Sequence, residues 1–203
     1  MKKKILALLL LSTFLLFGCT GKDNGKNNEP KEENQVVENQ TNTNAKEETP
    51  QSPAGSPLGF DTLALTGEDI HKNPVDNSIF KDKVTLVNVW GTFCGPCINE
   101  LQDLNALHQE FKDQNFQILG IIVDTLQGSD ENMDLAKQII TQKMITYPMV
   151  VPSQETVDNY LTAIQGVPTS FFVDGEGKII SDPIVGALPK AEYQKLIEKQ
   201  LEK

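Results

Sequence analysis

WGTFCGPC, residues 90–97, lies between two segments whose apolar residues follow different patterns. Residues 84–90 form a nearly continuous apolar run, which indicates a strand buried on both faces. After Pro96, apolar side chains recur at helical spacing, at Ile98, Leu101, Leu104, Leu107 and Phe111. The pattern therefore predicts a strand that passes directly into a helix, with Cys94 at the helix N-terminus and Pro96 in its first turn.

The two cysteines in this segment have the spacing and the placement that dithiol chemistry needs. Unpaired backbone N–H groups at a helix N-terminus favour an anion, and they can lower a thiol pKa from about 8.5 to about 7. That change is about 2 kcal/mol, which a well-placed helix terminus can supply. Cys97 can then attack a mixed disulfide on Cys94 and release the reduced substrate. This chemistry needs no dissociable cofactor, and we expect none beyond the redox-active pair itself.

Residues 90–97 resemble the active-site segment of the thioredoxin superfamily, and the resemblance extends through most of residues 58–203. Gly166-Val167-Pro168-Thr169, just ahead of a predicted strand, resembles the cis-proline loop of that family. The resemblance implies a cis bond before Pro168 and an extended backbone edge beside Cys94 that can pair with a substrate strand. It implies substrate contacts from Trp90, Gly95, Pro96, Val167 and Pro168, with Trp90 forming a wall of the site.

Two polar residues favour one subgroup, the TlpA/ResA-like membrane-tethered oxidoreductases. Asn88 stands where cytosolic thioredoxins carry a buried Asp, and Glu100, three residues after Cys97, matches the acid of the subgroup. The resemblance implies that Glu100 exchanges protons with the cysteine pair if it is partly buried. The alternative is a solvated helix residue. We expect Asn88 to be a hydrogen-bonded interior amide rather than a catalyst.

The first 18 residues have the layout of a secretory signal peptide, with Lys2, Lys3 and Lys4 followed by an almost wholly apolar run. An uncleaved membrane anchor is the alternative. Leu16-Phe17-Gly18-Cys19 resembles the lipobox of bacterial lipoproteins, although Phe17 is bulkier than the usual residue. The resemblance implies cleavage before Cys19 and acylation of its thiol. Lipidation would also explain the odd number of cysteines, three, by leaving Cys94 and Cys97 as a pair.

Residues 19–57 comprise the lipidated cysteine and a polar segment with hardly any large apolar side chain, which predicts a disordered tether. The folded domain is expected at residues 58–203. Loss of the three lysines in residues 1–18 would change the net charge from −10 to −13. Such a surface repels nucleic acid and anionic lipid, so we expect no nucleic-acid partner and membrane attachment through acyl chains.

Beyond the first helix, predicted strands and helices alternate. A short hairpin turning at Thr66-Gly67 and ending near Ile70 precedes residues 84–90. Strands are predicted at 116–123 and 149–151, and helices at 131–143, 155–164 and 189–201. Strands 169–173 and 178–184 should pair across the turn at 174–177. This order predicts an α/β, thioredoxin-like fold, with a central mixed β-sheet flanked by helices and an N-terminal β-hairpin extension.

These observations predict a monomeric, extracytoplasmic thiol-disulfide oxidoreductase, anchored to the bacterial cell membrane as a lipoprotein. The Gly95-Pro96 spacer resembles reducing thioredoxins more than oxidants, which favours reduction of disulfides in exported proteins. The resemblance implies a membrane thiol transporter of the CcdA or DsbD type as electron donor. Substrates in such families include apocytochrome c and oxidised methionine sulfoxide reductase, and the sequence does not choose between them.

Three other functions remain as alternatives, and a fourth, that of a peroxiredoxin, is discounted. A disulfide-forming oxidant would use the same dithiol in the opposite direction. A copper carrier on this fold would have a wider cysteine spacing and a distal histidine, whereas His71 and His108 both lack ligand spacing to the cysteines and no histidine follows His108. We therefore predict no metal site. A peroxiredoxin would have Thr where Gly91 stands. A lipoprotein that only binds a partner could keep the cysteines as a structural disulfide.

Overall fold

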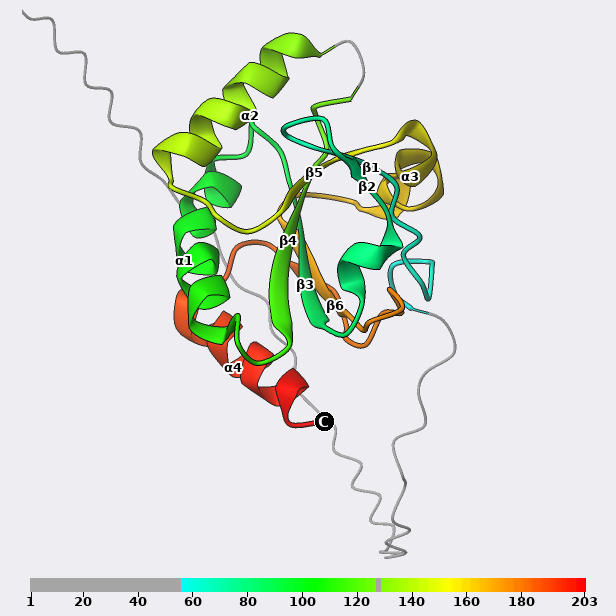
Figure 1. The fold of residues 1–203 in the computed structure, drawn as a ribbon, viewed down its shortest axis with the longest axis vertical. Coiled ribbons are helices and arrows are strands. Elements are labelled where there is room, and N and C mark those ends of the chain that lie inside the picture. The colour runs from blue at the N-terminus through cyan, green and yellow to red at the C-terminus, as the bar shows by residue number, and fades with distance from the viewer. Residues whose placement is uncertain (1–55, 127–128) are drawn as a thin grey trace, which may run out of the picture. The chain divides into compact units, whose positions relative to one another are not determined.

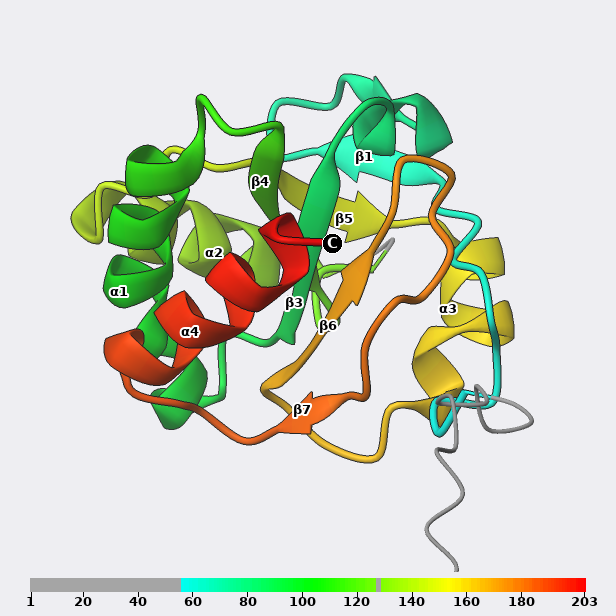
Figure 2. The same cartoon turned by 90° about the horizontal axis from the view of Figure 1, so that it is seen from below.

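The computed structural model describes residues 56–126 and 129–203, which form a mixed sheet with helices on both faces (Figures 1 and 2). The predicted signal peptide, the acylated Cys19 and nearly all of the predicted tether lie outside these residues. None of the helices in the described part of the chain has the length and apolar character needed to cross a membrane.

The sheet of the described residues contains seven strands in the order β2-β1-β5-β4-β3-β6-β7. The central strands β3, β4 and β5 are parallel, and all other neighbours are antiparallel. In sheet order the strands are β2 (Pro74–Val75), β1 (Gly67–Asp69), β5 (Met149–Pro152), β4 (Phe116–Ile122), β3 (Val84–Trp90), β6 (Thr169–Val173) and β7 (Ile184–Val185). This arrangement confirms the predicted mixed sheet and places the strand that precedes the dithiol in its middle.

Helices α1, α2 and α4 cover one face of the sheet, and α3 covers the other (Figure 2). Their bounds are Gly95–Phe111 for α1, Asp130–Gln142 for α2, Gln154–Asn159 for α3 and Lys190–Leu201 for α4. Two 3-10 turns, η1 (Asn77–Phe80) and η2 (Leu161–Ala163), complete the elements of the described residues. Because successive side chains of a strand point to opposite faces, Leu86 and Trp90 of β3 enter the α1 core, whereas Val87 and Val89 enter the α3 core.

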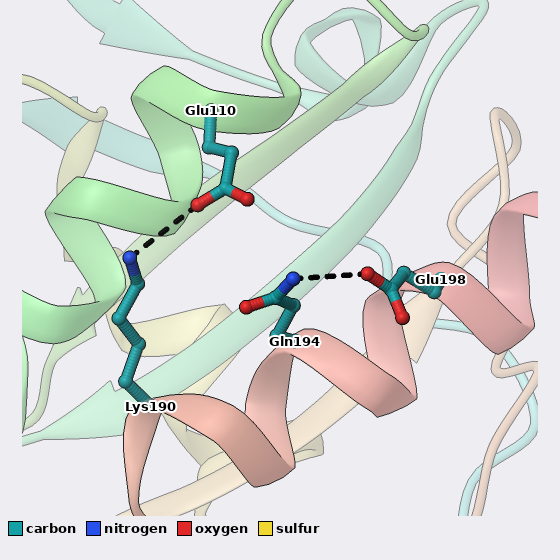
Figure 3. A network of polar contacts seen from close by, with 4 residues as sticks. All are labelled: Glu110, Lys190, Gln194 and Glu198. Atoms are coloured by element: carbon teal, nitrogen blue, oxygen red, sulfur yellow. Dashed lines mark hydrogen bonds and ion pairs between the residues drawn. The ribbon is translucent and has the colours of Figure 1, made fainter.

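Helix α4 packs against α1, mainly through apolar side chains. Tyr193 and Ile197 are fully buried in the same core as Leu104. On the surface, Lys190 Nζ of α4 lies 3.3 Å from Glu110 Oε2 of α1, while Gln194 donates to Glu198 within α4 at 3.0 Å (Figure 3). Both side chains of the ion pair are about two-fifths exposed, at 40% and 44%, so the pair contributes little to stability. Apolar burial therefore fixes α4 and, with it, Tyr193.

The N-terminal hairpin is present, but its predicted turn at Thr66-Gly67 is wrong. Gly67 begins strand β1, and the chain turns at residues 70–73, where the carboxylate of Asp69 accepts the backbone N–H groups of His71 and Asn73 at 2.7 and 2.9 Å. A Cβ on Gly67 would collide with the carbonyl oxygen of Val151. The glycine thus permits close approach of β1 to β5 and does not mark a turn.

The second strand predicted after β6, at residues 178–184, is also largely wrong. Only an isolated bridge joins Ile179 to Val173, and the strand β7 begins at Ile184, pairing with the start of β6. Between them Ser181 Oγ accepts the N–H of Phe172 at 2.9 Å, and Pro183 has no N–H to donate. A side chain thus replaces a ladder bond, and the register of pairing with β6 changes between Ile179 and Ile184.

Candidate active site

Cys94 is the N-cap residue of α1, as predicted. Its sulfur accepts the backbone N–H of Cys97 at 3.2 Å, and its carbonyl accepts that of Ile98 at 3.1 Å. A disulfide joins Cys94 to Cys97. In the reduced protein, the N–H of Cys97 and the helix terminus would stabilise a thiolate on Cys94, because both place positive partial charge beside the sulfur.

The two sulfurs differ in accessibility. Cys94 is 7% exposed, whereas Cys97 is fully buried. The intervening Gly95 and Pro96 are exposed and leave Cys94 open to one side. A sulfur arriving from solvent can therefore reach Cys94 but not Cys97.

The loop that precedes β6 lies against Cys94. The bond between Val167 and Pro168 is cis, which confirms the prediction, and the carbonyl oxygen of Val167 lies 3.6 Å from Cys94 Sγ. Pro168 is buried, and its carbonyl accepts the N–H of Gly186 at 2.8 Å. Val167 is only partly buried and borders the surface next to the dithiol.

The aromatic side chain at the surface is Phe93 rather than Trp90. Trp90 is fully buried beneath the site, so it packs in the core and offers no surface to a substrate in this state. Phe93, absent from the predicted contacts, is 71% exposed. Together with Val167 it borders a groove of ≈ 470 Å³ whose other lining residues are mostly apolar, including Val123, Val157, Leu161 and Ile164. The signal in the sequence was a large aromatic residue immediately before the reactive cysteine.

Glu100 is buried on the inner face of α1, one turn after Cys97, which excludes a solvated helix residue. Only 4% of Glu100 is exposed. Its Oε1 accepts from Asn88 Nδ2 at 2.9 Å, and its Oε2 accepts from the hydroxyl of Tyr193 at 3.1 Å. Burial raises the pKa of the Glu100 carboxyl above its usual 4.5, although the hydrogen bonds from Asn88 and Tyr193 act in the opposite direction.

A serine closes this polar network. Asn88 Nδ2 also donates to Ser170 Oγ at 2.9 Å, and Ser170 Oγ lies 3.4 Å from the hydroxyl of Tyr193. Asn88 is thus an interior amide, as predicted, whose nitrogen is hydrogen-bonded and whose Oδ1 has no hydrogen-bond partner among the described residues. Sequence reasoning did not find Ser170 or Tyr193, because they come from β6 and α4, far along the chain. Burial, followed by the charge of Glu100, raises the pKa of the Tyr193 phenol far above neutrality, so it remains protonated.

A second polar cluster holds the turn between β3 and Cys94. The carboxylate of Asp124, directly after β4, accepts the backbone N–H of Thr92 at 3.1 Å and its hydroxyl at 2.6 Å. Asn132 of α2 donates to the carbonyl of Asp124 at 2.8 Å. Thr92 is buried, so these bonds fix the backbone two residues before the reactive cysteine.

Neither histidine lies in the site. His71 is exposed in the hairpin turn, and His108 accepts the N–H of Ile118 through Nδ1 at 3.2 Å. Burial, with Lys83 and Lys112 adding to it, lowers the pKa of His108. Across residues 56–126 and 129–203, no three side chains of His, Cys, Asp or Glu gather as metal ligands would.

Comparisons with known proteins agree with this geometry. The model of the AhpC/TSA family matches residues 60–181. A thiol-disulfide oxidoreductase ResA from Bacillus thuringiensis is 26% identical over 143 residues, which cover 70% of this chain and 78% of the relative.

Solved structures agree with the fold. The thioredoxin domain of a thiol-disulfide oxidoreductase from Bacteroides vulgatus has a TM-score of 0.58 and 28% identity, covering 71% of this chain and 97% of that one. A thioredoxin-family thiol:disulfide interchange protein from Chlorobium tepidum has a TM-score of 0.61 at 23% identity, covering 74% of this chain and 99% of that one. The predicted thioredoxin-like fold is confirmed.

Proposed function

We infer that this chain, which belongs to the AhpC/TSA family, is a thiol-disulfide oxidoreductase, and we propose that it reduces disulfides of exported proteins. The observation that carries the proposal is the pair of sulfurs at the start of α1. Cys94, at the N-cap, is 7% exposed, and Cys97, bonded to it, is fully buried. This arrangement provides one nucleophile and one resolving group.

The reaction proceeds in two exchanges. The thiolate of Cys94 attacks one sulfur of the substrate disulfide, whose S–S bond breaks, and the other substrate sulfur leaves as a thiolate and takes a proton from solvent. Cys97 passes its proton to the carboxylate of Glu100 and attacks Cys94 Sγ. The Cys94–Cys97 disulfide forms, and the second substrate sulfur leaves as a thiolate that is protonated in turn. Two electrons have moved from the protein to the substrate.

The cis-proline loop and the adjacent groove hold the substrate. An extended substrate segment pairs with the backbone of Val167, next to Pro168, while its sulfur meets Cys94, 3.6 Å from the carbonyl of Val167. The exposed Phe93 and the surface of Gly95 and Pro96 border the same approach. Trp90 supports this surface from below.

Turnover requires an electron donor, because each cycle leaves the protein oxidised. We propose a membrane thiol transporter of the CcdA or DsbD type for this role. Apocytochrome c and oxidised methionine sulfoxide reductase are the proposed substrate classes. The exposed Gly95-Pro96 spacer, which resembles that of reducing thioredoxins, supports reduction over oxidation.

We further propose that the protein is a lipoprotein outside the cytoplasm, attached through an acylated Cys19 after removal of residues 1–18. The basic start, the apolar run and the lipobox-like residues 16–19 support this proposal. Metabolic labelling with a radioactive fatty acid in a bacterial host should label the protein and not its Cys19→Ser variant. Equal labelling of both would contradict acylation at Cys19.

The activity is tested by turnover of a model disulfide, such as insulin, with a small thiol as reductant. We expect Cys94→Ala to abolish catalysis and Cys97→Ala to accumulate a mixed disulfide with the substrate, visible by non-reducing electrophoresis. Cys19→Ser should match the unsubstituted protein. Undiminished turnover by Cys94→Ala would overturn the function, and faster oxidation of a reduced substrate protein than reduction of insulin would reverse the proposed direction.

A further inference from the structure

In the proposed cycle Glu100 must hold a proton in one half and release it in the other. The inference drawn below, about the neighbours of Glu100, rests on that cycle. A carboxylate only accepts hydrogen bonds, whereas a carboxylic acid also donates one. A buried group left without a suitable partner in either form is costly. With 4% of Glu100 exposed, its protein neighbours must satisfy both forms.

Asn88 stabilises the carboxylate form of Glu100. Its Nδ2 donates to Glu100 Oε1 and to Ser170 Oγ, both at 2.9 Å, and an amide nitrogen cannot accept in return. Asn88 could accept from the acid only if the whole amide turned over within a fully buried position. Asn88 therefore favours the charged form.

Tyr193 can serve both forms. Its hydroxyl donates to Glu100 Oε2 at 3.1 Å when Glu100 is charged. When Glu100 is protonated, the same oxygen can accept from the acid while its own hydrogen turns toward Ser170 Oγ, 3.4 Å away. The exchange requires only hydrogens to rotate, so the packed side chains stay in place.

We propose that Tyr193 is a positioning residue for the acid, and that the hydroxyl pair of Tyr193 and Ser170 reverses its direction when Glu100 takes the proton of Cys97. The proton leaves Cys97 Sγ and arrives at a Glu100 oxygen, and no other covalent bond changes. Helix α4, which carries Tyr193, thereby takes part in the redox cycle without touching the substrate.

Several ionisable groups share this environment with Glu100. Tyr193 approaches from α4, Tyr147 from the segment before β5, and Asp103 from the next turn of α1, while Cys97 lies one turn earlier. Burial is the largest influence and raises the pKa of Glu100. Hydrogen bonds from Asn88, Tyr193 and the backbone of Leu188 lower it, and the charge of Asp103 raises it. The hydrogen bond from Tyr193 is thus one of the contacts that stabilise the charged form of Glu100.

The direct test is a carbon-13 NMR titration of the glutamate carboxyl carbons in the oxidised protein, where the cysteines do not titrate. The Glu100 signal is the one missing from Glu100→Gln. Tyr193→Phe removes a donor to the charged form, and we expect the Glu100 midpoint to rise by about one pH unit. Tyr147→Phe is the matched control, because Tyr147 is a buried tyrosine whose hydroxyl has no hydrogen-bond partner. Its midpoint should equal that of the unsubstituted protein.

Ser170→Ala provides a change of opposite sign. Without Ser170 the Tyr193 hydroxyl has no acceptor for its own hydrogen while it accepts the hydrogen bond of protonated Glu100. The protonated form is then disfavoured, and the midpoint should fall by about half a unit. If Tyr193→Phe does not fold, this variant still decides the matter. The inference would be overturned if the Glu100 midpoint were unchanged in whichever of Tyr193→Phe and Ser170→Ala fold. A shift of equal size in Tyr147→Phe would overturn it as well.

A kinetic readout separates this inference from the proposed function. The rate at which Cys97 resolves a mixed disulfide on Cys94 should follow the same pH shifts, about tenfold slower below the midpoint for Tyr193→Phe. If Glu100→Gln alters this pH profile but neither hydroxyl variant does, the role of Tyr193 is overturned and the acid role of Glu100 stands. If all variants resolve normally, the acid role falls as well, while loss of turnover in Cys94→Ala would still support the oxidoreductase.

Discussion

Cys97 and Glu100 occupy one buried face of α1, whereas Cys94 opens to the surface at the helix start. Cys94 needs solvent contact to meet a substrate, and its 7% exposure provides it. In the proposed cycle Cys97 and Glu100 exchange a proton where water does not compete, because Cys97 is fully buried and Glu100 nearly so. The proposed nucleophile and the proposed acid thus lie in different environments on a single helix.

The raised pKa of Glu100 predicts how stability depends on pH. Since the folded pKa lies above the usual 4.5, the folded protein binds more protons than the unfolded chain between these two values. Stability contributed by this group therefore falls as pH rises from about 4.5 through the folded pKa. Glu100→Gln cannot titrate, so its free energy of unfolding relative to the unsubstituted protein should increase over that range.

Urea unfolding of the oxidised proteins from about pH 4 to about pH 8 checks this prediction. Glu110→Gln, at an exposed position of the same helix, controls for the loss of one negative charge. If the free energy of unfolding of Glu100→Gln, measured relative to the unsubstituted protein, stays constant or falls as pH rises, a raised pKa is contradicted.

Residues near the motif were predictable from the sequence, and their distant partners were not. The N-cap position of Cys94 followed from local spacing, and the cis bond before Pro168 followed from a resemblance in the motif. The contact of Tyr193 with Glu100 requires α4 to return across the face that α1 covers. Nothing in the local pattern of residues 189–201 specifies that position, because tertiary packing decides it.

At the scale of elements, strong hydrophobic periodicity predicted the helices and the central strands. The helix predicted over 189–201 differs from α4 by one residue at its start, and the periodic residues from Ile98 to Phe111 all lie within α1. The predictions of a turn at Thr66-Gly67 and of a strand at 178–184 were wrong because a glycine or a side chain has a role there that the hydrophobic pattern does not show. Gly67 permits strand contact rather than a turn, and Ser181 replaces a ladder bond ahead of β7.

The packing of α4 gives a prediction at this scale. Ile197→Ala removes a fully buried side chain and should lower the free energy of unfolding by about 2–5 kcal/mol. Lys190→Ala breaks the exposed ion pair with Glu110 and should cost less than about 1 kcal/mol. Urea unfolding compares the two variants directly. A cost for Lys190→Ala equal to that for Ile197→Ala would show that charge, rather than apolar burial, holds α4 in place.

For the whole molecule, one sheet unites the parts of the site. Strand β3 leads into the dithiol, and β6 follows the cis-proline loop and supplies Ser170. Asp124, two residues after the end of β4, fixes the turn before Cys94. The neighbouring strands β4, β3 and β6 thus bring these groups to one place, although they come from distant parts of the chain. The predicted order of elements was sufficient to place the dithiol, while the details of Asp124 and Ser170 depended on the register.

The most direct measurement is the pH dependence of alkylation of the reduced protein, with the modified residue identified by mass spectrometry. Cys94 should react first, and its rate should reach half its maximum well below the pKa of about 8.5 of a free thiol. Cys97 should remain unmodified while the protein is folded, because it is fully buried. Reaction of Cys97 before Cys94, or a midpoint for Cys94 at or above that of a free thiol, would contradict the assignment of Cys94 as the nucleophile.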